Sequence, residues 1–329
     1  GKQIRTGLNQ TTPRTGNKIS NVLNRRSVNG QFAYFLGEKI KMAKVMIVGA
    51  NGQLGHELQR LLNEQGMVFD ALTEKELDIT DLDAVKAKIA ELQPAVLYDC
   101  AAYTAVDKAE DEGKALNWLV NVDGTKNLAQ VAAEQGVKLV YVSTDYIFDG
   151  TNKGEYLEDD PANPKNEYGR AKWAGEEAVR HSGADYYIVR TSWVFGEFGH
   201  NFVFTMQNLA KTHDKLTVVN DQLGRPTWTR TLAEFMAHLV KTEAASGTYQ
   251  LSNDNTATWY DFAKEILKDT DVEVAPVTSE QFPQKAYRPQ HSVMNLDKAK
   301  ATGYQILTWQ EALSMFNRSL VEKKNNLNM

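Results

Sequence analysis

The chain is poor in cysteine: Cys100 is the only one among 329 residues, so no intramolecular disulfide can form. This usage is typical of proteins in a reducing compartment, and we expect a cytoplasmic location. Cys100 ends an apolar run, Ala95 to Cys100, where we expect a small core residue rather than a nucleophile.

Long apolar runs and metal-ligand patterns are also missing. No stretch reaches the roughly 18 apolar residues of a membrane-spanning helix, so no membrane partner is expected. The six histidines show no metal-ligand spacing, and we predict no metal site. With 42% hydrophobic and 24% charged residues, the composition is that of an ordinary globular protein.

Acidic residues are scarce in one segment only, residues 1–41. This segment carries eight lysines and arginines against Glu38 alone, a local charge of +7, which leaves −12 on the rest. The body is therefore acidic, which argues against nucleic-acid binding. We expect 1–41 to be a non-native or disordered leader, with Met42 opening the fold. A transit peptide and a basic arm for an anionic polymer are the alternatives.

A glycine-rich turn follows the apolar run Val45 to Val48. Gly49, Gly52 and Gly55 have the spacing G-x-x-G-x-x-G, which differs from the G-x-G-x-x-G of ordinary dinucleotide folds and is associated with short-chain reductases. Gly49 allows a tight turn, Gly52 lets N–H groups approach a pyrophosphate, and Gly55 lets the next helix pack on the sheet. The turn predicts a nicotinamide dinucleotide site.

Tyr168 and Lys172 lie four residues apart, on one face of a predicted helix. The ammonium is expected to lower the phenol's pKa from about 10 toward working pH. Such a phenol can pass a proton to a carbonyl oxygen while hydride reaches the carbon. Thr144 follows the strand predicted at 138–143 and precedes Tyr168 by 24 positions, so both can face one pocket. The alternative is that Thr144 merely ends its strand.

Strands alternate with helices along the body, which predicts an α/β fold with a Rossmann-type doubly wound parallel sheet. We assign 42–190, with a returning segment at about 216–243, to the nucleotide-binding domain, and 191–215 and 244–325 to a smaller C-terminal α/β substrate lobe. The predicted strands are 44–48, 68–72, 95–100, 138–143, 185–190 and 216–220. The predicted helices are 53–63, 82–92, 115–134, 168–181, 201–211, 260–268 and 310–320.

Several short stretches of the sequence resemble one known family. They lie at 52–55, 78–80, 101–107, 143–150, 168–172, 190–195, 220–227 and 288–289. In all of them the chain resembles the dTDP-4-dehydrorhamnose reductases, a family of extended short-chain dehydrogenases/reductases. The resemblance implies NADPH-dependent reduction of the C4 carbonyl of dTDP-4-dehydro-L-rhamnose, the last step of dTDP-L-rhamnose synthesis. It implies a dTDP-sugar as the partner of a monomer or homodimer.

The same resemblance implies roles for matching residues. Tyr168 is the implied proton donor, Lys172 its electrostatic partner and ribose anchor, and Thr144 the carbonyl orienter. The cofactor contacts, from the turn and the resemblance together, are Gly49, Gly52, Gln53, Leu54, Gly55, Asp78, Ile79, Ala101, Ala102, Tyr103, Tyr168 and Lys172. The implied substrate contacts are Thr144, Asp145, Tyr146, Trp193 and Arg288, with Arg225 a weaker candidate for the diphosphate.

Cofactor choice depends on the end of the second strand, where an NAD-preferring enzyme places an acid on the ribose 2′-hydroxyl. Counting back from Asp78, this position is Thr73, which would not repel a 2′-phosphate, and Lys75 could pair with one. The negative charges of Glu74 and Glu76 would disfavour a bound 2′-phosphate. We therefore expect Thr73 to bind the cofactor and NADPH to be the preferred one, with use of NADH left open.

Two alternative functions share part of this pattern. A nucleotide-sugar epimerase or 4,6-dehydratase has the same Tyr/Lys pair, although dehydratases typically follow the catalytic Thr with Asp-Glu, whereas Asp145-Tyr146 follows Thr144. A non-catalytic regulatory subunit of methionine adenosyltransferase also resembles the family, and the intact trio disfavours it.

Overall fold

The computed structural model describes residues 25–28, 31–36, 39–42 and 44–327. Its centre is a six-stranded sheet in the order β13-β8-β7-β6-β4-β5, in which every pairing is parallel. The strands are β4 (Val45–Val48), β5 (Phe69–Leu72), β6 (Val96–Asp99), β7 (Lys138–Thr144), β8 (Tyr186–Thr191) and β13 (Gly247–Gln250). Nearly continuous burial along β4, β6 and β8 is typical of a parallel sheet covered on both faces.

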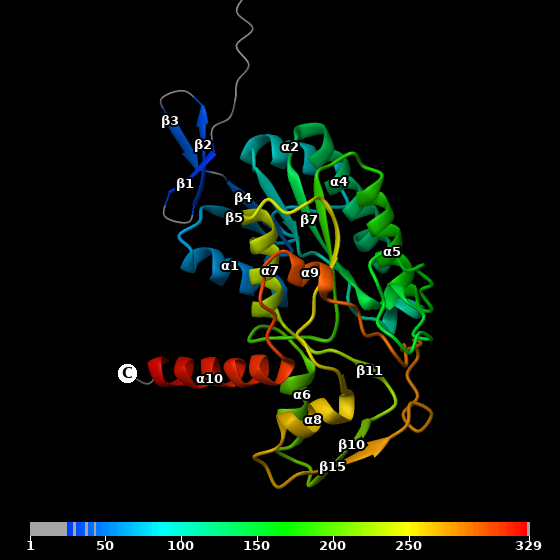
Figure 1. Cartoon of the computed structure of the whole chain (residues 1–329). Helices are drawn as coiled ribbons and strands as arrows, with labels where there is room; N and C mark the ends of the chain where they lie inside the picture. The colour runs from blue at the N-terminus through cyan, green and yellow to red at the C-terminus, as the bar shows by residue number, and fades with distance from the viewer. Residues whose placement is uncertain (1–24, 29–30, 37–38, 43, 328–329) are drawn as a thin grey trace, which may run out of the picture.

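Helices cover the two faces in separate layers (Figure 1). On one face lie α1 (Gln53–Glu64) and α7 (Thr229–Lys241), and on the other α2 (Leu82–Leu92), α4 (Thr125–Gln135) and α5 (Glu167–Arg180). Alternate residues of β7 serve the two layers: Val140 packs in the core with α1 and α7, whereas Leu139 and Tyr141 pack with α2 and α4. The predicted doubly wound parallel sheet is confirmed.

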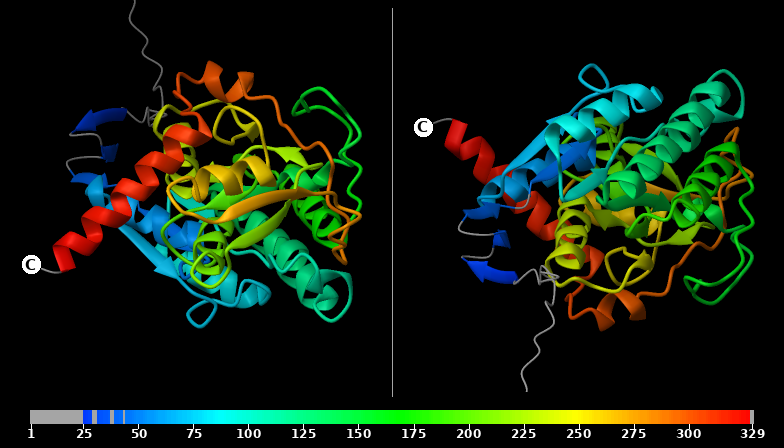
Figure 2. Two further views of the ribbon diagram at one scale, coloured as in Figure 1. Left: turned by 90° about the horizontal axis from the view of Figure 1, so that it is seen from below. Right: turned by 90° about the horizontal axis from the view of Figure 1, so that it is seen from above.

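A smaller group of elements lies beyond the carboxyl ends of the strands, in the lower part of Figure 1. Here α6 (Phe202–Leu209) and α8 (Trp259–Ile266) pack beside β10 (Lys215–Val219) and β15 (Glu273–Val277), which pair in parallel. Two further two-stranded pairs join β9 (Val194–Phe195) to β12 (Thr227–Trp228) and β11 (Leu223–Gly224) to β14 (Ala257–Thr258). From this group α10 (Trp309–Leu327) projects sideways, as both views of Figure 2 show.

The prediction of the sixth strand was wrong. Residues 216–219 do form a strand, but they lie in β10, which pairs with β15 and not with the central sheet. The sixth strand of the sheet is β13, which follows α7 and pairs with β8. The segment that returns to the sheet is therefore 229–250. Which strand becomes the sixth depends on the crossover connection through α7, and local sequence patterns do not reveal that connection.

The helix predicted at 115–134 is interrupted. It consists of α3 (Lys114–Trp118), a π-helical turn at Leu119–Gly124, and α4. A β-carbon at Gly124 would lie 2.7 Å from the side chain of Ile79, so the loop after β5 packs directly on this turn. Among the described residues no helix is long and apolar enough to cross a membrane.

The predicted leader falls partly outside the described residues, which begin at 25. Its described part forms β1 (Arg25–Val28), β2 (Gln31–Leu36) and β3 (Lys39–Met42), an antiparallel sheet with no pairing to any other described strand. We expect that deleting residues 1–41 leaves the melting temperature and activity within error, since the segment lacks an apolar periodicity that could join the core. A loss of several degrees in calorimetry would show that the segment packs on the rest of the fold.

Candidate active site

A cavity of about 620 Å³ opens at the carboxyl ends of β4, β6, β7 and β8. This edge is where open α/β sheets bind their ligands. Three predicted groups meet there: the glycine turn, the end of β6, and the three predicted catalytic residues. The predicted site residues in its lining are Gly52, Gln53, Leu54, Ala101, Ala102, Thr144, Asp145, Tyr146, Tyr168, Lys172 and Trp193.

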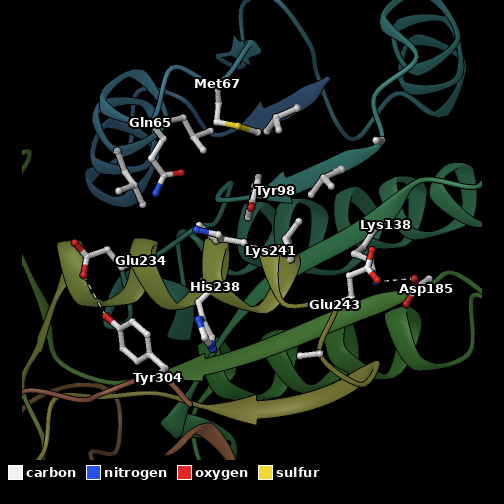
Figure 3. Close-up of a pocket in the computed structure, with 18 of the residues that line it drawn as sticks. Gln65, Met67, Tyr98, Lys138, Asp185, Glu234, His238, Lys241, Glu243 and Tyr304 are labelled. Carbon is white, nitrogen blue, oxygen red and sulfur yellow. Dashed lines mark hydrogen bonds and ion pairs between the residues drawn. The ribbon is translucent and has the colours of Figure 1, made fainter. Parts of the chain in front are cut away.

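A larger cavity, about 830 Å³, lies at the opposite edge of the sheet, between α7 and the amino-terminal ends of the strands (Figure 3). None of the predicted site residues lines it. Several of its charged side chains are already paired, as with Lys138 and Asp185 at 2.6 Å and Tyr304 and Glu234 at 3.2 Å. The candidate active site is therefore the smaller cavity.

The glycine turn has the shape that a dinucleotide requires. Gly49 has φ +73°, and a β-carbon there would lie 2.5 Å from the backbone N of Ala101. A β-carbon at Gly55 would lie 2.1 Å from the Gly49 carbonyl oxygen. The first turn of α1 has neither a side-chain cap nor an acidic residue, so its N–H groups and dipole are available to a phosphate.

The remaining predicted cofactor residues follow the carboxyl ends of β5 and β6. Tyr103 is held through its backbone by Asn121, which accepts from its N–H at 3.1 Å and donates to its carbonyl at 3.0 Å. Thr73 follows β5, and its N–H and Oγ1 donate to Glu76 at 2.6 and 2.8 Å. Asp78 and the buried Ile79 follow in the same loop. The cavity that holds the predicted catalytic residues is not lined by any of these four, Thr73, Asp78, Ile79 and Tyr103.

Close packing brings Thr144 and Tyr168 together. Thr144 ends β7, and its Oγ1 accepts from the N–H of Tyr146 at 3.1 Å. The side chain of Asn166 caps α5 by accepting from the N–H of Gly169 at 2.7 Å. A β-carbon at Gly169 would lie 2.2 Å from the Tyr146 carbonyl oxygen, so only glycine lets α5 start this close to the strand end.

The environment of Tyr168 differs from the prediction. Burial raises its pKa, the charge of Asp145 raises it further, and a hydrogen bond with Thr144 lowers it only in part. The expectation that Lys172 brings this pKa down toward neutrality was wrong, because desolvation disfavours the phenolate more strongly. The phenol is therefore protonated at neutral pH, which is the form that donates a proton.

Lys172 is buried one helical turn further along α5. Its Nζ donates to the Val142 carbonyl at 2.6 Å and lies 4.2 Å from the centre of the Tyr141 ring. Burial lowers the pKa of Lys172 to about 8, although the negative charges of Asp99 and Glu176 raise it in part. The ammonium thus persists at pH 7 and is lost within the pH range of an ordinary assay.

This value predicts an alkaline limb in the pH profile. The free enzyme should have full kcat/KM well below pH 8, where Lys172 is charged, and should lose about tenfold per pH unit above it. Initial rates between pH 6 and 10 would measure the limb, with the cofactor dissociation constant determined over the same range as the control. A flat profile up to pH 9.5 would show that the charge on Lys172 is not required.

Two of the predicted substrate residues, Asp145 and Trp193, line the same cavity. Asp145 is only 2% exposed, and burial raises its pKa to about 7. The Thr144 hydroxyl donates to its Oδ1 at 3.2 Å, and this bond and a hydrogen bond with Ser292 lower the pKa in part. Trp193 has φ +48° and stacks on Trp259, with ring centres 3.7 Å apart. Positive φ is strained for tryptophan, and such strain is concentrated at functional sites.

Arg288 lines a second, adjoining cavity of about 350 Å³. Tyr146 and Trp259 belong to both cavities, so the two adjoin along these rings. The weaker candidate, Arg225, is in neither lining: its buried guanidinium donates to the Met294 carbonyl and to Glu155. The walls of the second cavity are mainly apolar and include Phe202, Met206, Val218 and Phe282.

Sequence reasoning missed two residues that line the cavity of the predicted catalytic residues, Asp99 and Trp259. Asp99 is a buried acid at the end of β6, and its Oδ2 has no described hydrogen-bond partner. An acid inside the apolar run 95–100 was a visible signal. Trp259 gave no such signal, because only the tertiary approach of α8 brings it against Trp193. Among the described residues no group of three or more His, Cys, Asp or Glu side chains is arranged to hold a metal ion.

Comparison with known proteins identifies the family. Residues 43–321 match the family model described as the RmlD substrate binding domain. The chain belongs to this family. It is 42% identical over 278 residues to the dTDP-4-dehydrorhamnose reductase of Streptomyces griseus, covering 82% of this chain and 91% of that one. It is 41% identical over 275 residues to the spore coat polysaccharide biosynthesis protein SpsK of Bacillus subtilis, covering 83% and 96%.

A solved structure also matches most of this fold. The crystal structure of dTDP-4-dehydrorhamnose reductase from Bacillus anthracis in complex with NADP is 38% identical, with a TM-score of 0.81. The match covers 84% of this chain and 99% of that one. The predicted resemblance to the dTDP-4-dehydrorhamnose reductases is thus confirmed.

Proposed function

We propose that this RmlD-family chain reduces the C4 carbonyl of dTDP-4-dehydro-L-rhamnose with NADPH, giving dTDP-L-rhamnose. The observation that carries the proposal is the single cavity in which Thr144, Tyr168 and Lys172 face the glycine turn. The names of the relatives and the NADP complex of the Bacillus anthracis enzyme support it. Because the chain has a single cysteine, we place the enzyme in the cytoplasm. We further propose that it acts as a monomer or homodimer.

The residues present fit a dinucleotide. The N–H groups after Gly52 would hold the diphosphate, and the absence of a β-carbon at Gly49 and Gly55 keeps the turn tight enough to do so. Tyr168 and Lys172 would hold the nicotinamide ribose, with Ala101 and Ala102 beneath it. Thr73, Asp78, Ile79 and Tyr103 would hold the adenosine end. When bound, NADPH supplies the hydride.

The side chains of the cavity divide the remaining work. The Tyr168 hydroxyl, kept protonated by burial, donates its proton to the C4 oxygen as negative charge develops there. Thr144 orients the same oxygen with its hydroxyl, and the ammonium of Lys172 stabilises negative charge on this side of the cavity. Asp145 accepts from the sugar hydroxyls, and Trp193 forms an apolar wall for the sugar ring.

The second cavity is suited to the nucleotide part of the substrate. Arg288 offers a planar fork of N–H donors to the diphosphate, and Tyr146 lies beneath it, 5.8 Å from the guanidinium carbon to the ring centre. Aromatic and aliphatic side chains form the rest of the lining. A nucleoside with a flat base and an anionic tail matches this combination of apolar wall and single cation.

Replacing Thr73 with aspartate should reverse the cofactor preference from NADPH to NADH. The carboxylate would stand beside the 2′-phosphate. At an effective dielectric of about 20, two unit charges about 4 Å apart repel by about 4 kcal/mol before screening. Even a quarter of this energy changes the affinity ratio about fivefold. Dissociation constants of both cofactors for wild type and Thr73→Asp would measure the ratio, and an unchanged ratio would show that Thr73 does not face the ribose.

The direct test is an assay with purified protein, NADPH and dTDP-4-dehydro-L-rhamnose, followed at the nicotinamide absorbance. We expect NADPH consumption with stoichiometric dTDP-L-rhamnose. Conversion of another nucleotide sugar without net cofactor use would indicate an epimerase or dehydratase. Binding of cofactor and nucleotide with no turnover of any such sugar would favour a non-catalytic binding protein.

A further inference from the structure

Residues 278–290 form a loop that runs from β15 toward α9 (Asp297–Ala301), the orange segment on the right of Figure 1. On the lobe side, the Ser279 hydroxyl donates to Asp221 at 2.6 Å. On the opposite side, the Tyr287 hydroxyl donates to the carbonyl of Asp149, after β7, at 2.8 Å. The loop contributes three residues to the second cavity: Phe282 and Gln284 between these two anchors, and Arg288 directly after the second one.

One carboxylate outside the loop contacts it twice. Oδ1 of Asp107 accepts from the N–H of Ala286 at 2.9 Å, and its Oδ2 accepts from Nη2 of Arg288 at 3.0 Å. Asp107 lies after β6, just before a 3₁₀ turn at Lys108–Glu110, and so belongs to the nucleotide-binding part of the fold. A single side chain thus fixes both the backbone of the loop and the guanidinium that faces the cavity.

The pair leaves Arg288 able to bind an anion. Of its five N–H donors, one goes to Asp107 and one, from Nη1, to the Ala286 carbonyl at 3.1 Å. The other three have no hydrogen-bond partner among the described residues. The Arg288 side chain is 13% exposed and that of Asp107 45%, so the arginine lies inward and the acid lies at the rim. A guanidinium that is already oriented loses less side-chain entropy when an anion binds.

We infer that Asp107 is the positioning residue that orients Arg288 toward the diphosphate of the nucleotide sugar. This inference rests on the proposed function. Asp107 itself touches neither the reacting carbonyl nor the catalytic trio, and it does not line either cavity. Its loss should therefore weaken recognition of the diphosphate and leave the chemical step intact.

The first test is the kinetics of Asp107→Ala. We expect KM for the dTDP-sugar to rise about tenfold, the scale of one hydrogen bond to a charged group, with kcat and the NADPH dissociation constant within twofold of wild type. Asp111→Ala is the matched control: it removes the ion pair of Asp111 with Lys285 in the same loop, but no partner of Arg288. Its KM should stay within twofold of wild type, and an equal rise in both variants would overturn the inference.

A double-mutant cycle tests whether Asp107 acts through Arg288. KM of Asp107→Ala/Arg288→Ala should equal that of Arg288→Ala alone, whereas multiplied increases would show that the two act independently. If Asp107→Ala does not fold, Asp107→Asn can replace it, since its amide oxygen keeps an acceptor for Ala286 and the charge facing Arg288 is lost. An unchanged KM in this variant would equally refute the role.

Binding of simple ligands distinguishes this inference from the proposed function. Titration calorimetry should show that Asp107→Ala weakens binding of dTDP about tenfold and leaves binding of thymidine unchanged, because only dTDP carries the diphosphate. Equal losses for both ligands, or none for dTDP, would overturn the role of Asp107. Failure of the wild-type protein to bind dTDP or to reduce the dTDP-sugar would instead refute the proposed function.

Discussion

Replacing Tyr168 with phenylalanine is expected to lower kcat by about 100-fold to 10,000-fold, the usual contribution of general acid catalysis. Burial keeps the phenol protonated in the folded protein, so at neutral pH the hydroxyl is in the donating form. The variant removes this proton and little volume. The ring can still pack edge-on against Tyr146, whose centre is 6.1 Å away, and Lys172 remains to hold the ribose. The NADPH dissociation constant should therefore rise by less than about tenfold, the scale of one lost hydrogen bond.

The control for this variant is another tyrosine hydroxyl. Tyr187 lies on β8, and its hydroxyl donates to the Ala244 carbonyl at 2.7 Å, away from the catalytic cavity. Tyr187→Phe should keep kcat within about twofold of wild type. Steady-state rates with saturating NADPH and fluorescence titration of the cofactor would compare the two. A Tyr168→Phe enzyme with more than a tenth of the wild-type kcat would exclude Tyr168 as the proton donor.

Local signals predicted much of the fold. The helix expected at 82–92 is α2 with the same bounds, because Asp81 caps it by accepting from the N–H of Ala84 at 3.0 Å. Thr258 likewise caps α8 in a capping box with Asp261. By contrast, β10 and β13 are both short strands, and nothing within either one indicates its partner. Pairing is decided by the path of the chain between elements, so the sixth strand could not be assigned.

The same division applies to the site. The spacing of Thr144, Tyr168 and Lys172 predicted residues that do line one cavity, because strand ends and helix faces follow from local periodicity. The direction of the pKa shift at Tyr168 could not be predicted, since it is dominated by burial. The partner of Asp107 stands 181 positions further along the chain, at Arg288. No local pattern connects residues at such a distance.

Glu176 carries the second large expected effect, on stability. It is fully buried on α5 and accepts from Nε and Nη2 of Arg190, at 3.0 and 2.9 Å. Arg190 is itself only 1% exposed. Glu176→Gln places an amide against this guanidinium and leaves its charge unpaired. Breaking a buried pair in this way costs about 3–5 kcal/mol of unfolding free energy, or roughly 10 °C in melting temperature for a chain of this size.

The adjacent Glu177 provides the control, because it shares the partner Arg180 with Glu176 but is exposed. Glu177 is 40% exposed on its side chain and pairs with Arg180 at 2.6 Å, so Glu177→Gln should cost less than about 1 kcal/mol. Urea unfolding of both variants at pH 7 would compare them. A loss below about 1 kcal/mol for Glu176→Gln would show that the Glu158 carbonyl, 3.0 Å from Nη1, is enough to satisfy Arg190.

The difference between wild type and Glu176→Gln should also depend on pH. Burial alone would raise the pKa of Glu176, but hydrogen bonds and the charge of Arg190, with the charge of Arg180, hold it below its ordinary value. A carboxyl whose pKa is lowered by folding stabilises the protein above its unfolded pKa of about 4.5 and loses this effect as the pH falls through the folded value. The two unfolding free energies should therefore differ most near pH 7 and converge in acid. A gap that stays constant down to pH 3 would mean that the lost stability comes from packing around the new amide rather than from the charge of Glu176.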